Sequence, residues 1–133
     1  MEDLIRDFLR RGRRFAVFGV SRDPGKYGYR VYFDLKAKGF EVYAVNPNID
    51  SVDGDRVYAS VFDLPVKVDV AVLVVPPAVG LKVVEDCVRA GVGRFWLQPG
   101  AESEEILEFC EKSGVKVVWG VCVMVESAGG FYG

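Results

Sequence analysis

Runs of apolar residues alternate along this chain with segments in which apolar residues recur every three or four positions. The runs are rich in Val and Phe, which favour β-strands, and the recurring pattern is typical of amphipathic helices. Each of the six runs is therefore predicted to form a strand. The predicted strands cover residues 14–20, 40–45, 56–59, 68–75, 94–97 and 115–119.

The segments between these runs carry signals that begin and end helices. One segment has acids at its start and arginines at its end, which suits the helix dipole. Proline fits the first turn of a helix, serine can cap one, and a glycine after each segment is a natural stop. The predicted helices cover residues 2–11 and 28–38, and two more run from Pro76-Pro77 to Gly91 and from Ser103 to Gly114.

This alternation predicts an α/β fold in which residues 1–133 form one domain. Strand–helix–strand connections are right-handed, so a parallel sheet would carry helices on both faces, as in a Rossmann-like fold. We expect a doubly wound sheet whose strands, numbered along the chain, lie in the order 3-2-1-4-5-6. The glycine-rich tail, residues 127–133, is expected to be mobile.

Composition excludes several classes of function. The chain has no histidine, which rules out Ser-His-Asp and Cys-His catalysis and the usual zinc sites. A net charge of −2 disfavours binding to a nucleic-acid backbone. Three cysteines without paired spacing indicate reduced thiols. We therefore expect no metal site and no nucleic-acid partner, and the sequence identifies no catalytic residue.

The sequence predicts no membrane-spanning or export segment. No apolar run approaches the length of about 18 residues that a spanning helix needs, and the N-terminus carries early acids. The expected location is the cytoplasm, and the expected state is a monomer or small homo-oligomer. One Gln, two Asn and no Thr, beside many charged residues, are typical of thermophilic proteins.

The segment GVSRDPGKYG, at residues 19–28, joins a predicted strand to a predicted helix, as phosphate-binding loops do. Gly19 can take backbone angles that other residues avoid, Ser21 offers a hydroxyl and an N–H, and Gly28 lets the helix start approach closely. Positive charge comes from Arg22, Lys26 and Arg30. The alternative interpretation is an ordinary turn with solvated charges.

The loop lacks the dinucleotide spacing G-x-G-x-x-G and the P-loop spacing G-x-x-x-x-G-K-[ST]. An NAD-binding strand also usually ends in an acid that holds the ribose hydroxyls. Here the second predicted strand is followed by Asn46-Pro47, and Glu41 lies at its other end. A ligand with a phosphorylated ribose is therefore favoured over NAD, which stays open as an alternative.

Four motifs follow predicted strands in order: GVSRDPGKYG at 19–28, VNPN at 45–48, VVPP at 74–77 and WLQPGAES at 96–103. Together they resemble the small single-domain CoA-binding proteins, whose fold is similar to the CoA-binding domain of the succinyl-CoA synthetase α subunit. The resemblance covers nearly the whole chain and implies a Rossmann-like domain that binds coenzyme A at the carboxyl edge of its sheet. The synthetase carries its phosphorylated histidine in a second domain. This sequence contains neither that second domain nor any histidine, so synthetase activity is not implied.

The resemblance also implies where each part of the cofactor lies. Gly19, Val20, Ser21, Lys26 and Tyr27 would contact the phosphates. Asn46, Pro47 and Asn48 would line the ribose and adenine side, and Val75, Pro76 and Pro77 would wall the nucleotide pocket. Trp96, Gln98 and Gly100 would lie toward the pantetheine arm.

Cys122 follows the last predicted strand, near the expected site. It is either a thiol that can form a mixed disulfide with CoA or a buried packing residue. Three functions stay open: a module that carries, protects or senses CoA or an acyl-CoA, an enzyme or redox protein using Cys122, and an NAD-type nucleotide-binding domain. The missing histidine and the few acid–base candidates favour the binding module over an enzyme.

Overall fold

A seven-stranded sheet forms the middle layer of the protein. The computed structural model describes residues 1–133, and its strands lie in the order β3-β4-β2-β1-β5-β6-β7. All neighbouring strands are parallel except β3 and β4, which form an antiparallel pair at one edge. The strands are β1 (Arg14–Phe18), β2 (Glu41–Val45), β3 (Ser51–Val52), β4 (Asp55–Tyr58), β5 (Val70–Leu73), β6 (Arg94–Leu97) and β7 (Lys116–Trp119).

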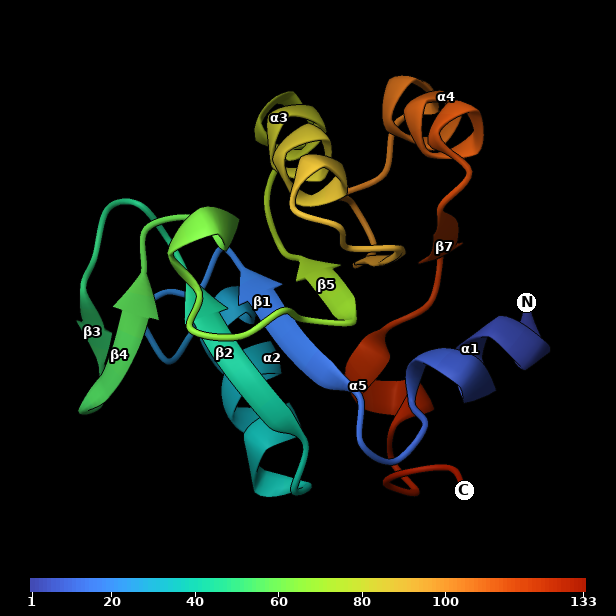
Figure 1. Ribbon diagram of the computed structural model, residues 1–133. Coiled ribbons are helices and arrows are strands. Elements are labelled where there is room, and N and C mark those ends of the chain that lie inside the picture. The colour runs from blue at the N-terminus through green and yellow to red at the C-terminus, as the bar shows by residue number, and fades with distance from the viewer.

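Helices cover both faces of this sheet (Figure 1). Two of them, α3 and α4, pack on one face, and α1, α2 and α5 pack on the other. No helix has both the length and the apolar character needed to cross a membrane. The helices are α1 (Glu2–Phe8), α2 (Tyr27–Ala37), α3 (Pro77–Arg89), α4 (Glu104–Ser113) and α5 (Val123–Glu126), and a 3₁₀ turn, η1, spans Val61–Asp63.

The predicted doubly wound α/β fold is confirmed, with one added strand. The six predicted strands are β1, β2, β4, β5, β6 and β7, and they lie in the predicted order. The additional strand, β3, has only two residues, too few to show a periodic pattern. It folds back on β4 through Asp53-Gly54, where φ is 46° and 86°. Asp-Gly favours turns in which both residues have positive φ, so this pair was the available signal for the hairpin.

Hydrophobic cores lie on both sides of the sheet. The central strands β1 and β5 are almost entirely buried, and successive side chains point to opposite faces. Phe15 and Val17 of β1 join the core under α1, α2 and α5, whereas Ala16 and Phe18 join the core under α3 and α4. Burial on both faces explains why these two strands read as continuous apolar runs rather than as alternating ones.

The C-terminal tail packs against the N-terminal region, although its glycine-rich sequence predicts a mobile segment. Tyr132 forms an isolated parallel bridge with Arg10, and its N–H donates to the Leu9 carbonyl at 3.0 Å. The rings of Phe131 and Phe40 lie 4.6 Å apart, centroid to centroid. The aromatic side chains at positions 131 and 132 supply the contacts that the surrounding glycines do not.

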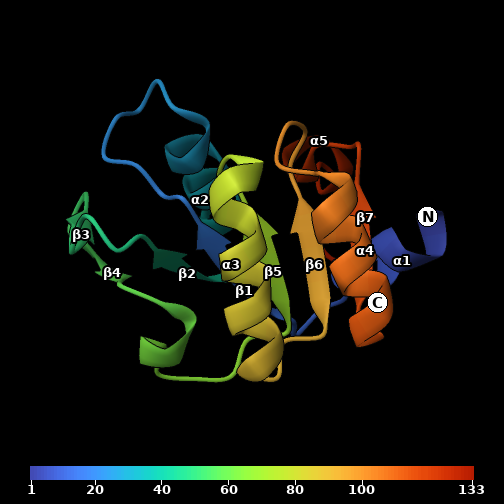
Figure 2. The same cartoon turned by 90° about the horizontal axis from the view of Figure 1, so that it is seen from above.

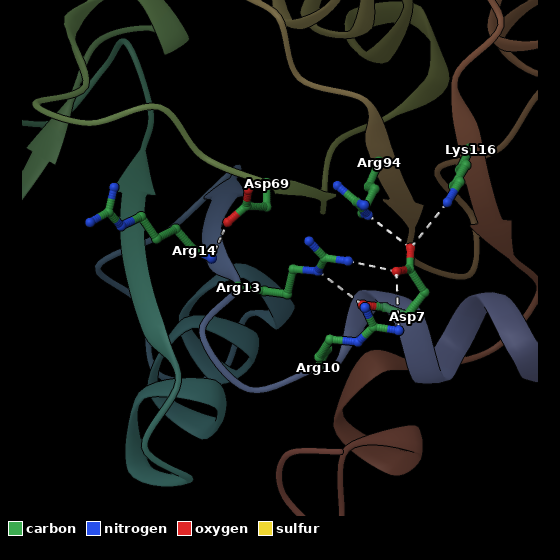
Figure 3. A network of polar contacts seen from close by, with 7 residues as sticks. All are labelled: Asp7, Arg10, Arg13, Arg14, Asp69, Arg94 and Lys116. Atoms are coloured by element: carbon green, nitrogen blue, oxygen red, sulfur yellow. Dashed lines mark hydrogen bonds and ion pairs between the residues drawn. The ribbon is translucent and has the colours of Figure 1, made fainter. Parts of the chain in front are cut away.

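One carboxylate, that of Asp7, joins α1 to the amino edge of the sheet (Figure 3). It accepts hydrogen bonds from Arg13 at 2.6 Å and from Arg94 at 2.8 Å, and Lys116 and Arg10 lie 3.4 Å and 4.0 Å away. Burial raises the pKa of Asp7, but the hydrogen bonds and charges of the two closer arginines outweigh it and hold the pKa well below its usual range. Asp7 is therefore ionised at any pH at which the protein is normally handled.

Replacing Asp7 by Asn should destabilise the fold at neutral pH by about 2 kcal/mol, because two guanidinium groups lose a charged acceptor. The folded-state pKa of Asp7 is lowered, so its contribution is full above the ordinary value of 3.8 and is lost as pH falls through the folded-state value. Urea unfolding between pH 7 and pH 2 should show the difference between the wild type and Asp7→Asn narrowing in acid. Asp3→Asn, an exposed acid of the same helix, is the control. A difference that does not change with pH would contradict this role.

Candidate functional site

The connection from β1 to α2 brings two stretches of backbone into direct contact. Gly19 has a φ of 96°, and a Cβ atom there would lie 2.2 Å from the Val74 carbonyl oxygen. A Cβ atom at Gly28 would lie only 1.9 Å from the carbonyl oxygen of Gly19. Only glycine fits at either position. The start of α2 therefore lies directly on the end of β1, and residues 20–26 must loop outward.

This loop leaves backbone donors available at the carboxyl edge of the sheet. The N–H groups of Val20 and Ser21, and those of Tyr27, Gly28 and Tyr29 at the start of α2, donate to no other group in the chain. Asp23 N–H donates to the Ser21 hydroxyl at 3.0 Å, and Gly25 N–H donates to Asp23 at 2.9 Å, which shapes the loop. Free N–H groups at a helix start attract anions, phosphates in particular.

Three cations lie in or next to the loop, and their surroundings differ. Lys26 is the residue that precedes α2, Arg30 lies in its first turn, and neither forms an ion pair. Arg22 is already engaged: its guanidinium donates to the Ser51 carbonyl at 2.9 Å and to Asp50 at 3.1 Å. Lys26 and Arg30 are therefore the cations free to meet an anion at the helix start.

The turn after β2 is fixed against this loop by Asn46. Its side-chain amide donates to the Val20 carbonyl at 2.8 Å, and its side-chain oxygen accepts from Asn48 N–H at 2.8 Å. Both ends of the Asn46 side chain are thus used in shaping the turn. Pro47 and Asn48 are held beside the loop as a result.

A cavity of about 500 Å³ lies between this turn, the end of β1 and the start of α3. Of the residues expected to bind the nucleotide, it brings together Gly19, Asn46, Pro47, Asn48, Val75 and Pro76. Pro77, by contrast, begins α3 and does not line it. Sequence reasoning missed Ala59, Ser60 and Val61. All three follow β4 at the same sheet edge, so the rule that sites lie beyond strand ends could have found them.

A smaller cavity of about 230 Å³ adjoins the first, and Val75 and Pro76 line both. Its other walls include Tyr27, which is 57% exposed, and the turn after β6. Among the expected site residues, Gln98 and Gly100 lie here. These two adjoining cavities are called the groove below. They lie along the carboxyl edge, at the end of the molecule where Figure 2 shows the loop after β1, the start of α3 and the turn after β6.

Gln98 lines the smaller cavity and holds the neighbouring elements in place. It is 3% exposed, its side-chain oxygen accepts from Val123 N–H at 2.8 Å, and its amide donates to the Cys122 sulfur at 3.3 Å. These bonds hold the start of α5 against the end of β6. Cys122 therefore lies beside a wall of the smaller cavity, although it does not line the cavity itself.

The expectation that Trp96 faces the pantetheine arm needs correction. Trp96 is fully buried, its indole N–H donates to the Val121 carbonyl at 3.0 Å, and its ring packs edge-on against Phe8. It belongs to the core under α1, because alternate residues of β6 point to opposite faces of the sheet. Trp96 packs the interior and does not line the groove.

The other two thiols are also interior. Burial raises the pKa of the Cys110 thiol to about 11, and burial raises the pKa of Cys87 further still. Both therefore stay protonated and pack in the core under α3 and α4. Cys122 is the one cysteine that is not fully buried.

The groove is suited to holding a ligand. Free N–H groups and unpaired cations lie next to it at the start of α2, and its apolar walls include proline and valine. Lys82 and Asp86, which line the larger cavity, form an ion pair with each other at 2.9 Å. Glu102, near the smaller cavity, accepts from Gly100 N–H at 3.0 Å. Free N–H groups and cations beside apolar walls suit a ligand that carries phosphates and a flat apolar group. Lys82, Asp86 and Glu102 are already engaged in bonds within the protein.

Known proteins match this chain over most of its length. A family model described as the CoA binding domain matches residues 13–128. A conserved hypothetical protein from Pyrococcus furiosus has a similar structure, with a TM-score of 0.82 and 54% identity over 86% of this chain and 98% of that one. A hypothetical protein from Pyrococcus horikoshii OT3 superposes with a TM-score of 0.91 and 30% identity, over 97% and 91% of the two chains.

A longer protein matches over the same region. The alpha subunit of the ADP-forming acetate–CoA ligase II of Pyrococcus furiosus is 33% identical over 88% of this chain. The match takes up 28% of the ligase subunit. The chain therefore corresponds in length to the two hypothetical proteins and to one part of the ligase subunit.

Replacing Gly28 by Ala should destabilise the protein by about 1–3 kcal/mol, because the added methyl group meets backbone that cannot move aside. Gly25→Ala is the matched control in the same loop, since its nearest contact is a flexible Asp23 side chain at 3.3 Å. Chemical unfolding of the two variants measures the difference. Equal stability of both would show that β1 and α2 do not meet as described.

Proposed function

The chain belongs to the CoA-binding domain family, and on this premise we propose that it binds coenzyme A or an acyl-CoA in the groove at the carboxyl edge of its sheet. One observation carries the proposal: two adjoining cavities, both lined by Val75 and Pro76, lie beside free N–H groups at the start of α2. CoA has the matching order of parts, with a purine and a flexible arm on either side of a pyrophosphate.

Each part of the cofactor has a counterpart in the groove. The pyrophosphate would meet the N–H groups of the loop and the ammonium group of Lys26, because charge-assisted hydrogen bonds to phosphate are strong. The adenine ring would fill the larger cavity between Pro47 and Pro76. The pantetheine arm would follow the smaller cavity past Tyr27 toward Gln98.

We infer a binding module rather than a complete enzyme. The polar groups around the groove are committed to structural bonds, as Asn46, Gln98 and the Lys82–Asp86 pair show. The match takes up 28% of the ligase subunit, so we infer CoA binding from it and not the ligase reaction. Carrying, protecting or sensing CoA or its thioesters fits a groove with this character.

Saturating CoA should stabilise the purified protein, by about 2.7 kcal/mol at a hundred times its Kd, whereas NAD at the same concentration should not. Lys26→Gln should weaken CoA binding about tenfold by removing one charged contact with phosphate. Thermal unfolding and calorimetric titration measure both effects. Lys112→Gln, an exposed change of the same charge on α4, is the control. Stabilisation by NAD but not by CoA would overturn the proposal.

A second candidate function uses Cys122, because its hydrogen bond from Gln98 places the sulfur beside the smaller cavity. With CoA disulfide, the Cys122 thiolate would attack one sulfur, form a mixed disulfide with the protein and release one CoA thiolate. This exchange would let the module trap CoA under oxidising conditions.

Incubation with CoA disulfide should add one CoA to the wild type, which mass spectrometry of the intact protein and its peptides would locate at Cys122. Cys122→Ser should still bind reduced CoA with unchanged affinity and should gain no adduct. The buried Cys87 and Cys110 provide internal controls, since neither should react. An adduct that persists in Cys122→Ser would remove this candidate.

A further inference from the structure

The amino edge of the sheet, opposite the groove, carries a surface rich in cations. They come from α1, from the turn after it and from the first residues of β6 and β7. Figure 3 shows several of them pointing toward Asp7, which is the only carboxylate within 4.0 Å of any of them. The surface is therefore strongly positive in a chain whose net charge is −2. Its cations, called the basic edge below, are Arg6, Arg10, Arg11, Arg13, Arg94 and Lys116.

Arg94 has hydrogen-bond donors to spare. Its side chain is 23% exposed, and only Nε is used, donating to Asp7 at 2.8 Å. The two Nη groups donate to nothing in the chain, and neither is sealed from solvent. Lys116 Nζ lies 3.4 Å from the same Asp7 oxygen. One carboxylate cannot neutralise all the cations that share it, and partly buried charge without a partner is unfavourable, so a second anion beside Arg94 and Lys116 would be stabilising.

Two further arginines are held by aromatic rings of the tail. The Arg6 guanidinium lies 5.1 Å from the centroid of the Tyr132 ring, and that of Arg11 lies 5.1 Å from the centroid of the Phe131 ring. A ring positions a guanidinium while leaving its N–H groups free for a carboxylate. Arg10, whose side chain is 62% exposed, pairs with Tyr132 through its backbone and connects this part to the cations around Asp7.

The extent of the basic edge indicates the kind of partner. Arg6 and Arg11 stand over the tail rather than around Asp7, so one small ion cannot meet all the cations. Carboxylates spaced along an extended chain can meet them in turn. A nucleic-acid backbone also has spaced charges, but it would run past this surface over a protein that is negative as a whole. Toward β1, Arg14 is already paired with Glu41 at 3.1 Å, which limits the basic edge on that side.

We propose that the basic edge docks an acidic segment of a partner protein, with one of its carboxylates on the free Nη groups of Arg94 beside Lys116 and others on Arg10 and Arg11. Arginine and carboxylate form paired, charge-assisted hydrogen bonds of matching geometry. Complementary charge also speeds the encounter of two proteins. Because the basic edge and the groove lie at opposite edges of the sheet, the module can hold CoA and this partner at the same time.

Fluorescence anisotropy of a labelled peptide of about eight glutamates, long enough to cross the basic edge, tests this assignment with the whole protein at low ionic strength. The wild type should bind the peptide, and Arg94→Gln should weaken binding about tenfold. Arg94 also supports the fold through Asp7, so Arg11→Gln serves as a second variant and should weaken binding about threefold. Lys112→Gln on α4 and Arg30→Gln at the carboxyl edge are matched controls and should leave the peptide Kd unchanged.

Saturating CoA should not displace the peptide, and a labelled oligothymidylate of the same length should bind more weakly than the peptide. No peptide binding, or the same Kd for the wild type, Arg94→Gln and Arg11→Gln, would overturn the inference. Equal weakening by Arg30→Gln would overturn it too, because the peptide would then bind at the loop after β1. Tighter binding of the oligonucleotide would indicate a nucleic-acid surface instead. Displacement by inorganic phosphate, beyond the effect of chloride at equal ionic strength, would indicate a small-ion site instead.

Discussion

The contact between the end of β1 and the start of α2 constrains the whole carboxyl edge. With no side chain at Gly19 or Gly28, backbone meets backbone, and the chain between them has to leave the sheet as an open loop. The loop then exposes N–H groups that a longer or looser connection would have satisfied internally. The contact between β1 and α2 also brings the carbonyl of Val20 within reach of Asn46. The absence of side chains at Gly19 and Gly28 therefore positions both the loop and the neighbouring turn.

The groove that results is made mainly from backbone and from rigid side chains. Proline walls at positions 47 and 76 lose no hydrogen-bonding donor and little conformational freedom when a ligand is bound. The polar residues nearby, such as Gln98, are occupied in joining one strand end to the next. Fixed surfaces of this kind lose little conformational entropy when they bind a ligand, which favours the CoA binding proposed above.

The sequence could predict the sheet order, because fully buried strands and their helices give strong patterns and parallel connections have one handedness. It could not predict β3 and α5 in the same way, since two and four residues carry no period. The site residues also fall into those that a sequence rule reveals and those that it does not. Those next to strand ends, such as Gly19 and Pro47, were predictable by rule. Trp96 was misplaced because a strand buried on both faces does not reveal which core each residue enters, and the Arg22 contact with Asp50 depends on the hairpin that the pattern missed.

Stability and recognition lie at opposite edges of this sheet. At the amino edge, Asp7 gathers cations from three parts of the chain, and the tail closes over the N-terminal segment through Tyr132. These contacts involve α1 and residues 129–133, which lie outside residues 13–128, the region that the family model matches. Because these contacts hold both chain ends against the sheet far from the groove, the carboxyl edge can keep its donors and cations unpaired without destabilising the fold. Donors and cations without partners within the protein add little to its stability, and the bonds made at the amino edge of the same sheet offset that loss.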